Sequence, residues 1–336
     1  MFSELKEDIK REKMVVDQYI SEFLRRYSNN KPELARYNKV LRYYFEAGGK
    51  RIRPYLTMKF CKLFGGNPKL ALPICAAVEI IHQATLIHDD IEDQSEYRRG
   101  VKTLHAAFDI PTAITSGTHL ISLAYLSLTE LEIPKEDVTF FSSIFSDLIL
   151  KMIEGQYLDI ENSGNLSLSE EDYFKTIRKK TGELLKIACI GGALVSGRDK
   201  VILQKAGEYG INLGIAFQIQ DDVLDITGRF IETGKSVGND IREGKINLIV
   251  IHFLQHCSQK DKDKFLNIFG NSKAKNREIK EVINLFKKYK SIDYAKMKAI
   301  EFSTNAKNVL SELDSYDNKS KDMLIKLANY VVLREK

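Results

Sequence analysis

Two groups of aspartates with the same spacing are the residues of this chain best suited to chemistry. The first is Asp89-Asp90-Ile91-Glu92-Asp93 and the second is Asp221-Asp222-Val223-Leu224-Asp225. Each follows a strongly apolar run, and in a helix the outer aspartates of each group lie one turn apart on one face. Burying such charges without a counter-charge is costly. The pattern therefore predicts that the rest of the chain is a scaffold that brings the two groups to face each other around cations.

The residue types indicate which cation would bind. Carboxylates without a clustered set of His or Cys favour a hard ion such as Mg²⁺. Magnesium held by one or two carboxylates keeps open positions for phosphate oxygens. Two such groups could therefore hold several ions and one diphosphate between them.

Basic residues suited to phosphate lie near both acidic groups in the sequence. They stand at predicted helix ends or in Gly-flanked loops, where Arg in particular offers a planar fork to phosphate oxygens: Lys50, Arg53, Arg98, Arg99, Lys180, Lys235 and Lys245. The chain has no GxxxxGK[ST] motif, so it is not a P-loop protein. The runs 75–87 and 211–219 are apolar. A dry pocket with metals at its mouth suits a long hydrocarbon with a diphosphate head. The metals would stabilise the leaving pyrophosphate, and the exclusion of water would protect the carbocation from hydrolysis.

Each of these residues also has a plainer interpretation. One acidic group alone could be a surface run of charge. His82 by itself is more often a core histidine with satisfied hydrogen bonds. Lys50 and Arg53 could form a solvated turn, and Lys235 and Lys245 could be ordinary loop lysines.

Composition favours one class of protein and excludes others. The 336 residues include only six prolines and no Trp, and the net charge of +5 is too small and dispersed for nucleic acid. The four cysteines show no CxxC spacing, which indicates a reduced, cytoplasmic compartment. The first residues are charged, unlike a signal peptide. No run of about 18 apolar residues is uninterrupted, so we expect no membrane span.

Apolar residues recur at helical spacing through most of the chain, and no segment has strand periodicity. Long buried helices should cover about 70–93 and 199–226, each ending in an acidic group. Other helices fit about 3–27, 32–46, 54–64, 113–130, 136–160 and 170–178, then a run after Thr181 to about 196, and most of 247–336. We expect a loop at 98–100 and a functional loop at 228–245.

Taken together, the motifs resemble the trans-type isoprenyl diphosphate synthases of the polyprenyl synthetase family. The resemblance covers about residues 40–250, in matching order and spacing. Its motifs are Gly48 to Pro54, Glu79 to His82 leading to His88-Asp89-Asp90, Arg98-Arg99-Gly100, Lys180-Thr181, Phe217-Gln218 to Asp225, and Gly234-Lys235 to Asp240 with Lys245. The family implies an all-α fold, a single domain over 1–336 with long antiparallel helices around a central cavity, and usually a homodimer. The C-terminal helices would occupy about 251–336.

The resemblance also implies roles. Two or three Mg²⁺ ions would be held by Asp89, Asp93 and Asp221, with Asp90, Asp222 and Asp225 in support. Arg98, Lys180, Lys235 and Lys245 would hold an allylic diphosphate, with Thr181 and Gln218 at its reacting end. Lys50, Arg53, His82 and Arg99 would hold isopentenyl diphosphate. The predicted catalytic residues are Asp89, Asp93, Lys180, Thr181, Gln218 and Asp221. The reaction would be ionisation of the allylic diphosphate, attack by the isopentenyl double bond, and loss of a proton to the departing pyrophosphate.

Product length follows from the residues below the first acidic group. A helix rises about 5.4 Å per turn, close to the reach of one isoprene unit. In this family a bulky residue four or five positions before the first Asp closes the pocket at C15. Thr85 and Ala84 stand there and are small, with Ile81 one turn further down. We therefore expect a product longer than C15, with C20 or C25 favoured.

Two other functions fit part of the pattern. A non-catalytic or regulatory subunit of a heteromeric synthase would be marked by lost aspartates, but both groups are intact. A terpene cyclase of the same fold would not need the isopentenyl-binding cations.

The chain departs from the family pattern at two places. Gly117-Thr118 stands where the family often has Gly-Asp, and Gly182 follows Thr181 where the family usually has Ala. Thr118 and the next residue, His119, could make the wall of the cavity unusual for the family.

Overall fold

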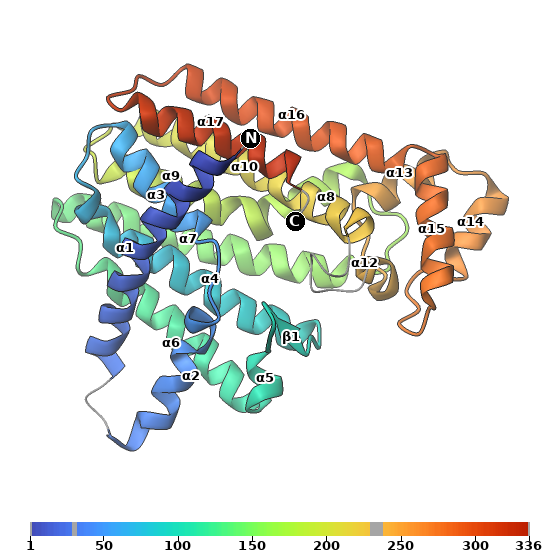
Figure 1. The fold of residues 1–336 in the computed structure, drawn as a ribbon, viewed down its shortest axis with the longest axis horizontal. Helices are drawn as coiled ribbons and strands as arrows, with labels where there is room; N and C mark the ends of the chain where they lie inside the picture. Colours follow the sequence, from blue (N-terminus) through green and yellow to red (C-terminus); the bar gives the residue numbers. More distant parts are fainter. Residues whose placement is uncertain (1, 29–31, 229–237, 335–336) are drawn as a thin grey trace. The chain divides into compact units, whose positions relative to one another are not determined.

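The computed structural model describes residues 2–28, 32–228 and 238–334. These ranges are almost entirely helical, which confirms the all-α prediction (Figure 1). The chain forms two compact units, each described separately below. The first comprises Met1–Ser146, Ile187–Gly207 and Leu313–Lys326; the second comprises Asp147–Lys186, Glu208–Glu312 and Leu327–Lys336.

The first unit is built around the helix that ends in the first acidic group. It contains α1 (Ser3–Ser28), α2 (Ala35–Glu46), α3 (Ile52–Leu63), α4 (Leu72–Glu92), α5 (Leu104–Ala107), α6 (Ile110–Leu128) and the start of α7 (Lys135–Glu161), with 3-10 turns η1 (Pro32–Leu34) and η2 (Pro68–Ala71). The predicted helix boundaries differ from these by a few residues, except that α5 was not predicted. In this unit α4 packs against α3, α6 and α1. Figure 1 shows α4 and α6 running side by side.

Helix α4 is apolar because it is buried on most sides. The stretch Pro68–Glu92 is long and apolar enough to cross a membrane by length and composition alone, but 72% of its apolar window is buried inside the protein. A core helix passes the same test. Gly117 of α6 leaves room for the His88 side chain of α4, because a Cβ at Gly117 would lie 2.2 Å from His88 Nε2.

The second unit surrounds the helix that carries the second acidic group. It contains the end of α7, α8 (Glu170–Ile177), the π-helical turn η3 (Arg178–Gly182), the start of α9 (Glu183–Leu194), most of α10 (Lys200–Thr227), α12 (Asn239–Glu243), α13 (Leu248–His256), α14 (Gln259–Leu266), α15 (Asn276–Lys288), α16 (Ser291–Ser311) and the end of α17 (Asn318–Leu333). Phe253, Phe265 and Phe286 are fully buried in its core. Ile219 and Val223 of α10 belong to the same cluster, so the core fixes one face of α10.

A short hairpin replaces the loop expected at residues 98–100. Strands β1 (Tyr97–Arg98) and β2 (Val101–Lys102) pair antiparallel, with Arg98 opposite Val101. Arg99 and Gly100 form the turn and both have positive φ, 52° and 79°. Two-residue hairpin turns favour that conformation because it matches the strand twist. Strands of two residues are too short to show a period, so the sequence pattern could not reveal them.

Candidate active site

Of the three aspartates in the first acidic group, one points inward and two point outward. Asp90 is 1% exposed. Its oxygens accept hydrogen bonds from the Tyr44 hydroxyl and from Arg98 Nε, at 2.8 and 2.9 Å for the arginine. Asp89 is half-buried and Asp93 is exposed at the end of α4. The outer pair is therefore placed to meet a ligand, while Asp90 is engaged by protein donors.

Arg98 is held in place by that inward carboxylate. Its Nη2 also lies 2.6 Å from Asp90 Oδ1. Burial disfavours its charged form, but the hydrogen bonds and charge of Asp90 outweigh burial and raise the pKa of Arg98. The guanidinium therefore stays a fixed cation beside Asp89 and Asp90.

A second basic set lies in the same unit, on the loop before α3, in the first turn of α3, on α4 and on the hairpin. Lys50 and Arg99 are exposed, whereas Arg53 and His82 are half-buried. Burial lowers the pKa of His82 well below its usual value, and the charges of Arg53 and Arg99 add to the effect. The imidazole is therefore neutral at pH 7 and can donate one hydrogen bond without adding charge.

The second acidic group shows the same division. Asp222 is 8% exposed and accepts hydrogen bonds from the Tyr173 hydroxyl at 2.7 Å and from Gln218 Nε2 at 3.0 Å. Burial, strengthened by the charge of Asp240, raises the pKa of Asp222 well above its usual range. Asp221 and Asp225 are more open. The middle aspartate of each group thus points inward onto a tyrosine.

The second group lines a cavity of about 470 Å³ that lies wholly within the second unit. Its polar lining is Asp159, Asn162, Ser163, Tyr173, Thr176, Lys180, Gln218, Asp221, Asp222, Asp225, Asp240, Lys245, Asn247 and Arg334. The sequence predicted six of these: Lys180, Gln218, Asp221, Asp222, Asp225 and Lys245. Thr181 reaches the cavity through Gln218, since Thr181 Oγ1 donates to Gln218 Oε1 at 2.8 Å. Lys180 Nζ lies 2.7 Å from Asp159 Oδ2.

The lining of this cavity fits magnesium and phosphate by its chemistry. Its acidic groups offer only oxygen donors, which Mg²⁺ prefers. Over the described ranges, no three His, Cys, Asp or Glu side chains are grouped so that they could hold a metal ion alone. Mg²⁺ is typically bound by one or two carboxylates, with phosphate and water completing its shell. The residues present are therefore those that a metal shared with a diphosphate would use.

Comparison with known proteins identifies the family. Residues 35–286 match the family model described as polyprenyl synthetase. The chain belongs to the polyprenyl synthetase family. It is 36% identical over 297 residues to the geranylgeranyl pyrophosphate synthase of Geoglobus acetivorans, covering 88% of this chain and 90% of the relative. It is 40% identical over 279 residues to the short chain isoprenyl diphosphate synthase of Methanocaldococcus jannaschii, covering 83% of each.

A solved structure supports the same assignment. The geranylgeranyl pyrophosphate synthetase from Pyrococcus horikoshii superposes with a TM-score of 0.91 at 34% identity, and 99% of each chain is covered. Like these relatives, the chain is a prenyltransferase.

In this polyprenyl synthetase, the turn that carries Lys180 and Thr181 is held between two helices at glycines. A Cβ on Gly155 of α7 would lie 2.5 Å from the Lys180 backbone nitrogen. A Cβ on Gly214 of α10 would lie 2.7 Å from Gly182 Cα. The π-helical form of η3 adds a residue to the turn. Close backbone packing therefore decides where the Lys180 and Thr181 side chains project.

Arg334 is a site residue that the sequence analysis missed. Its guanidinium pairs with Asp221, and its Cζ lies 4.0 Å from the centre of the Phe217 ring. Its side chain is 6% exposed. The Arg334 carbonyl accepts a hydrogen bond from Gln220 at 3.1 Å. Arg334 belongs to the Lys-rich C-terminal part and to no motif, so only its burial and contacts in the folded protein show that it is part of the site.

The remaining predicted residues are placed as follows. Lys235 lies outside the described residues. Ala84 and Ile81 are fully buried, and Thr85 is half-buried, donating to the His82 carbonyl at 2.9 Å. Thr118 is exposed. His119 contacts the Tyr37 ring of α2, with centroids 5.5 Å apart.

Gly214→Ala should push the Lys180–Thr181 turn away from α10. The new methyl group meets backbone atoms rather than a movable side-chain end, so we expect a loss of about 1–3 kcal/mol of unfolding free energy. Urea unfolding followed by circular dichroism measures it. Asn212→Ala on the same helix adds no atoms and should change stability by about 0.5 kcal/mol at most. Equal stability of Gly214→Ala and the parent would show that this close approach is unnecessary.

Proposed function

We propose that this prenyltransferase condenses isopentenyl diphosphate head to tail with an allylic diphosphate. The product would be a trans-polyprenyl diphosphate longer than C15, with C20 favoured over C25. The observation that carries the proposal is the cavity in which Lys180, Gln218, Asp221, Asp225 and Lys245 converge. Relatives named geranylgeranyl synthases support C20. That residues 1–336 work as a single domain around a central cavity stays a prediction.

We assign the outward carboxylates to two or three Mg²⁺ ions. Asp89 and Asp93 would serve in the first unit, and Asp221 and Asp225 in the second. Bound magnesium would supply positive charge to the leaving pyrophosphate. Asp90 and Asp222 would support these ligands, as the sequence suggested, because protein donors hold their oxygens in place. They hold Arg98 and Gln218 in place.

The basic residues divide between the two substrates. Arg98, Lys180, Lys235 and Lys245 would hold the allylic diphosphate. The hydrogen-bonded pair Thr181 and Gln218 would line its reacting end. Lys50, Arg53 and Arg99, with the neutral His82, would hold isopentenyl diphosphate. The departing pyrophosphate would take the proton, since it is the strongest base left beside the new double bond.

We further propose that the active form is a homodimer in the cytoplasm. An apolar stripe on α7 supports the dimer: Leu150, Ile153, Tyr157 and Ile160 are 62, 60, 61 and 53% exposed. Their spacing puts them on one helix face, as in a helix–helix seam. All four cysteines are free thiols, which fits a reducing compartment.

Product analysis tests the reaction. The purified protein, with Mg²⁺, labelled isopentenyl diphosphate and each primer from C5 to C20, should give mainly a C20 product. Asp89→Ala should lower kcat by roughly 10²–10³-fold, because one anchor of the charge on the leaving group is lost.

Glu92→Ala is the matched control, since Glu92 is exposed on the same turn and has no assigned role. No incorporation with any primer would contradict the elongation reaction and favour a regulatory subunit. Conversion of a single prenyl diphosphate to a hydrocarbon would favour a cyclase.

Ala84→Phe should shorten the main product, because the added ring would fill the space one turn below Asp89. Chromatography of the dephosphorylated products measures the change. Thr85→Phe serves as a second variant at the half-buried neighbouring position. If both leave the product distribution unmoved, the floor of the pocket lies elsewhere, with His119 the next residue to replace.

Ile153→Asp should convert the homodimer to a monomer, because it places a charge in the middle of the α7 stripe. Sedimentation velocity measures the oligomeric state. Val201→Asp, at an exposed apolar position on α10 rather than α7, is the control and should remain dimeric. An Ile153→Asp protein that sediments like the parent would show that the stripe is not the interface.

A further inference from the structure

Arg51 stands between two predicted substrate-binding residues, Lys50 and Arg53, but differs from both. Its side chain is 2% exposed, whereas Lys50 is exposed and Arg53 is half-buried. It caps α3 in the left-handed conformation, with φ 52° and ψ 40°. Non-glycine residues rarely adopt that conformation unless surrounding contacts impose it. The contacts of its guanidinium therefore decide the path of this loop.

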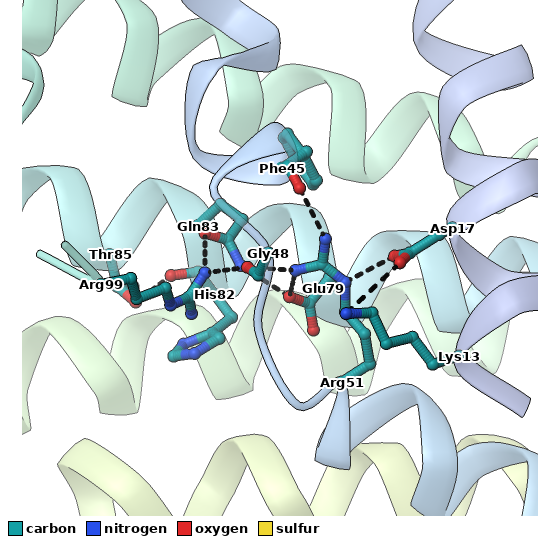
Figure 2. Close-up of polar contacts among 10 residues, drawn as sticks. All are labelled: Lys13, Asp17, Phe45, Gly48, Arg51, Glu79, His82, Gln83, Thr85 and Arg99. Atoms are coloured by element: carbon teal, nitrogen blue, oxygen red, sulfur yellow. Dashed lines mark hydrogen bonds and ion pairs between the residues drawn. The ribbon is translucent and has the colours of Figure 1, made fainter. Parts of the chain in front are cut away.

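Those contacts join four parts of the first unit (Figure 2). Arg51 Nε donates to Asp17 Oδ1 of α1 at 2.7 Å, and Nη1 donates to Glu79 Oε1 of α4 at 2.7 Å. Nη1 also donates to the Gly48 carbonyl at 3.3 Å, and Nη2 to the Phe45 carbonyl at 3.1 Å. One side chain thus fastens the loop to the end of α2, to α1 and to α4.

The charges make this arrangement specific for arginine. The Glu79 side chain is only 3% exposed, so losing its partner would leave a buried carboxylate uncompensated. Burial opposes the charge of Arg51, but Glu79 and Asp17 outweigh it and raise its pKa. Lysine could not reach acceptors on three sides, because it lacks the planar fork.

The network continues to the predicted isopentenyl-binding residues. Gln83 Nε2 donates to Glu79 Oε1 at 2.6 Å. Arg99 Nη1 donates to the Gly48 carbonyl and reaches Gln83 Oε1 at 3.5 Å. Arg51 and Arg99 therefore share one acceptor, Gly48 O. Arg99 is placed by the loop that Arg51 holds.

The guanidinium groups of Arg51 and Arg99 both approach the loop closely at Gly49. A Cβ built there would lie 3.1 Å from Arg51 Nη1 and 3.1 Å from Arg99 Nη1. Partial burial of its guanidinium lowers the pKa of Arg99; the charge of Glu79 opposes this effect and the charge of Arg51 adds to it. Glu79 is thus the counter-charge that lets two arginines stand together.

We propose that Arg51 is a positioning residue for isopentenyl diphosphate, a role that rests on the function proposed above. Its donors are directed at protein acceptors, so it does not bind substrate. It fixes Lys50 and Arg53 on either side in the chain, and Arg99 through Gly48. A displaced cation weakens binding of the diphosphate that this set would hold, and leaves the allylic cations of the second unit, Lys180 and Lys245, unchanged.

The test is Arg51→Met, with both substrates titrated separately. KM for isopentenyl diphosphate should rise roughly tenfold or more, since small displacements of positioning groups have large effects. KM for the allylic diphosphate should stay within about twofold. Calorimetric titration with isopentenyl diphosphate should show the same weakening without turnover. Arg51→Lys should fall between Arg51→Met and the parent.

Lys59→Met provides a matched control on the same helix. Lys59 is 3% exposed and lies 2.6 Å from Asp8 and 3.1 Å from Glu12, so its loss also breaks a buried ionic network. It should lower the thermal midpoint and leave both KM values near those of the parent. If Arg51→Met and Lys59→Met change the two KM values alike, Arg51 serves stability alone and the proposal is overturned.

A milder variant covers the case in which Arg51→Met does not fold. Asp17 is 35% exposed, so Asp17→Asn removes one charge from the network at less cost. It should raise KM for isopentenyl diphosphate alone, by a smaller factor; unchanged binding in a folded Asp17→Asn protein would oppose the proposal. Failure of the parent to incorporate isopentenyl units would contradict the proposed function instead, and the calorimetric comparison would still decide the role of Arg51.

Discussion

Each acidic group depends on one buried carboxylate that the protein itself must satisfy. In both groups it is the middle aspartate, and in both a tyrosine hydroxyl donates to it: Tyr44 to Asp90 and Tyr173 to Asp222. An unsatisfied charge in that position would be costly. The second donor is Arg98 in the first group and Gln218 in the second. The same bonds that satisfy the buried charge therefore orient a residue assigned to the substrate.

The predicted substrate-binding cations largely come from segments where regular α-helix is interrupted. Lys50 lies in a loop in which several residues have positive φ values. Arg98 and Arg99 lie on a hairpin with a two-residue turn, and Lys180 lies on a π-helical turn. These interruptions direct side chains that a regular helix would spread around its circumference. Glycines at close backbone contacts, such as Gly214, make the approach possible. Packing between the main elements is thus translated into the placement of charge.

A buried ionic network is also a device for fixing a loop. Arg51 uses its donors on acceptors from α1, α2 and α4, while its neighbour Lys50 is exposed. Arg334 shows a related arrangement in the second unit, where it pairs with Asp221 beside the Phe217 ring. In both cases an arginine that makes no predicted substrate contact stabilises the setting of residues that do.

Much of the molecule follows from the sequence alone, because helical periodicity and turn residues are local signals. The apolar spacing predicted the all-α class and the longer helices up to residue 227 within a few residues, but not the short helices α5 and α12. The paired aspartates with Lys180 and Lys245 predicted most of the charged lining of the cavity. Only the tertiary structure decided which aspartate of each group turns inward, since Tyr44 and Tyr173 stand 46 and 49 residues from their partners. It alone showed the hairpin at Arg98 and the contact of Arg334 with Asp221, 113 residues apart. Burial and hydrogen-bond partners are set by residues far apart in the chain, and no local pattern encodes them.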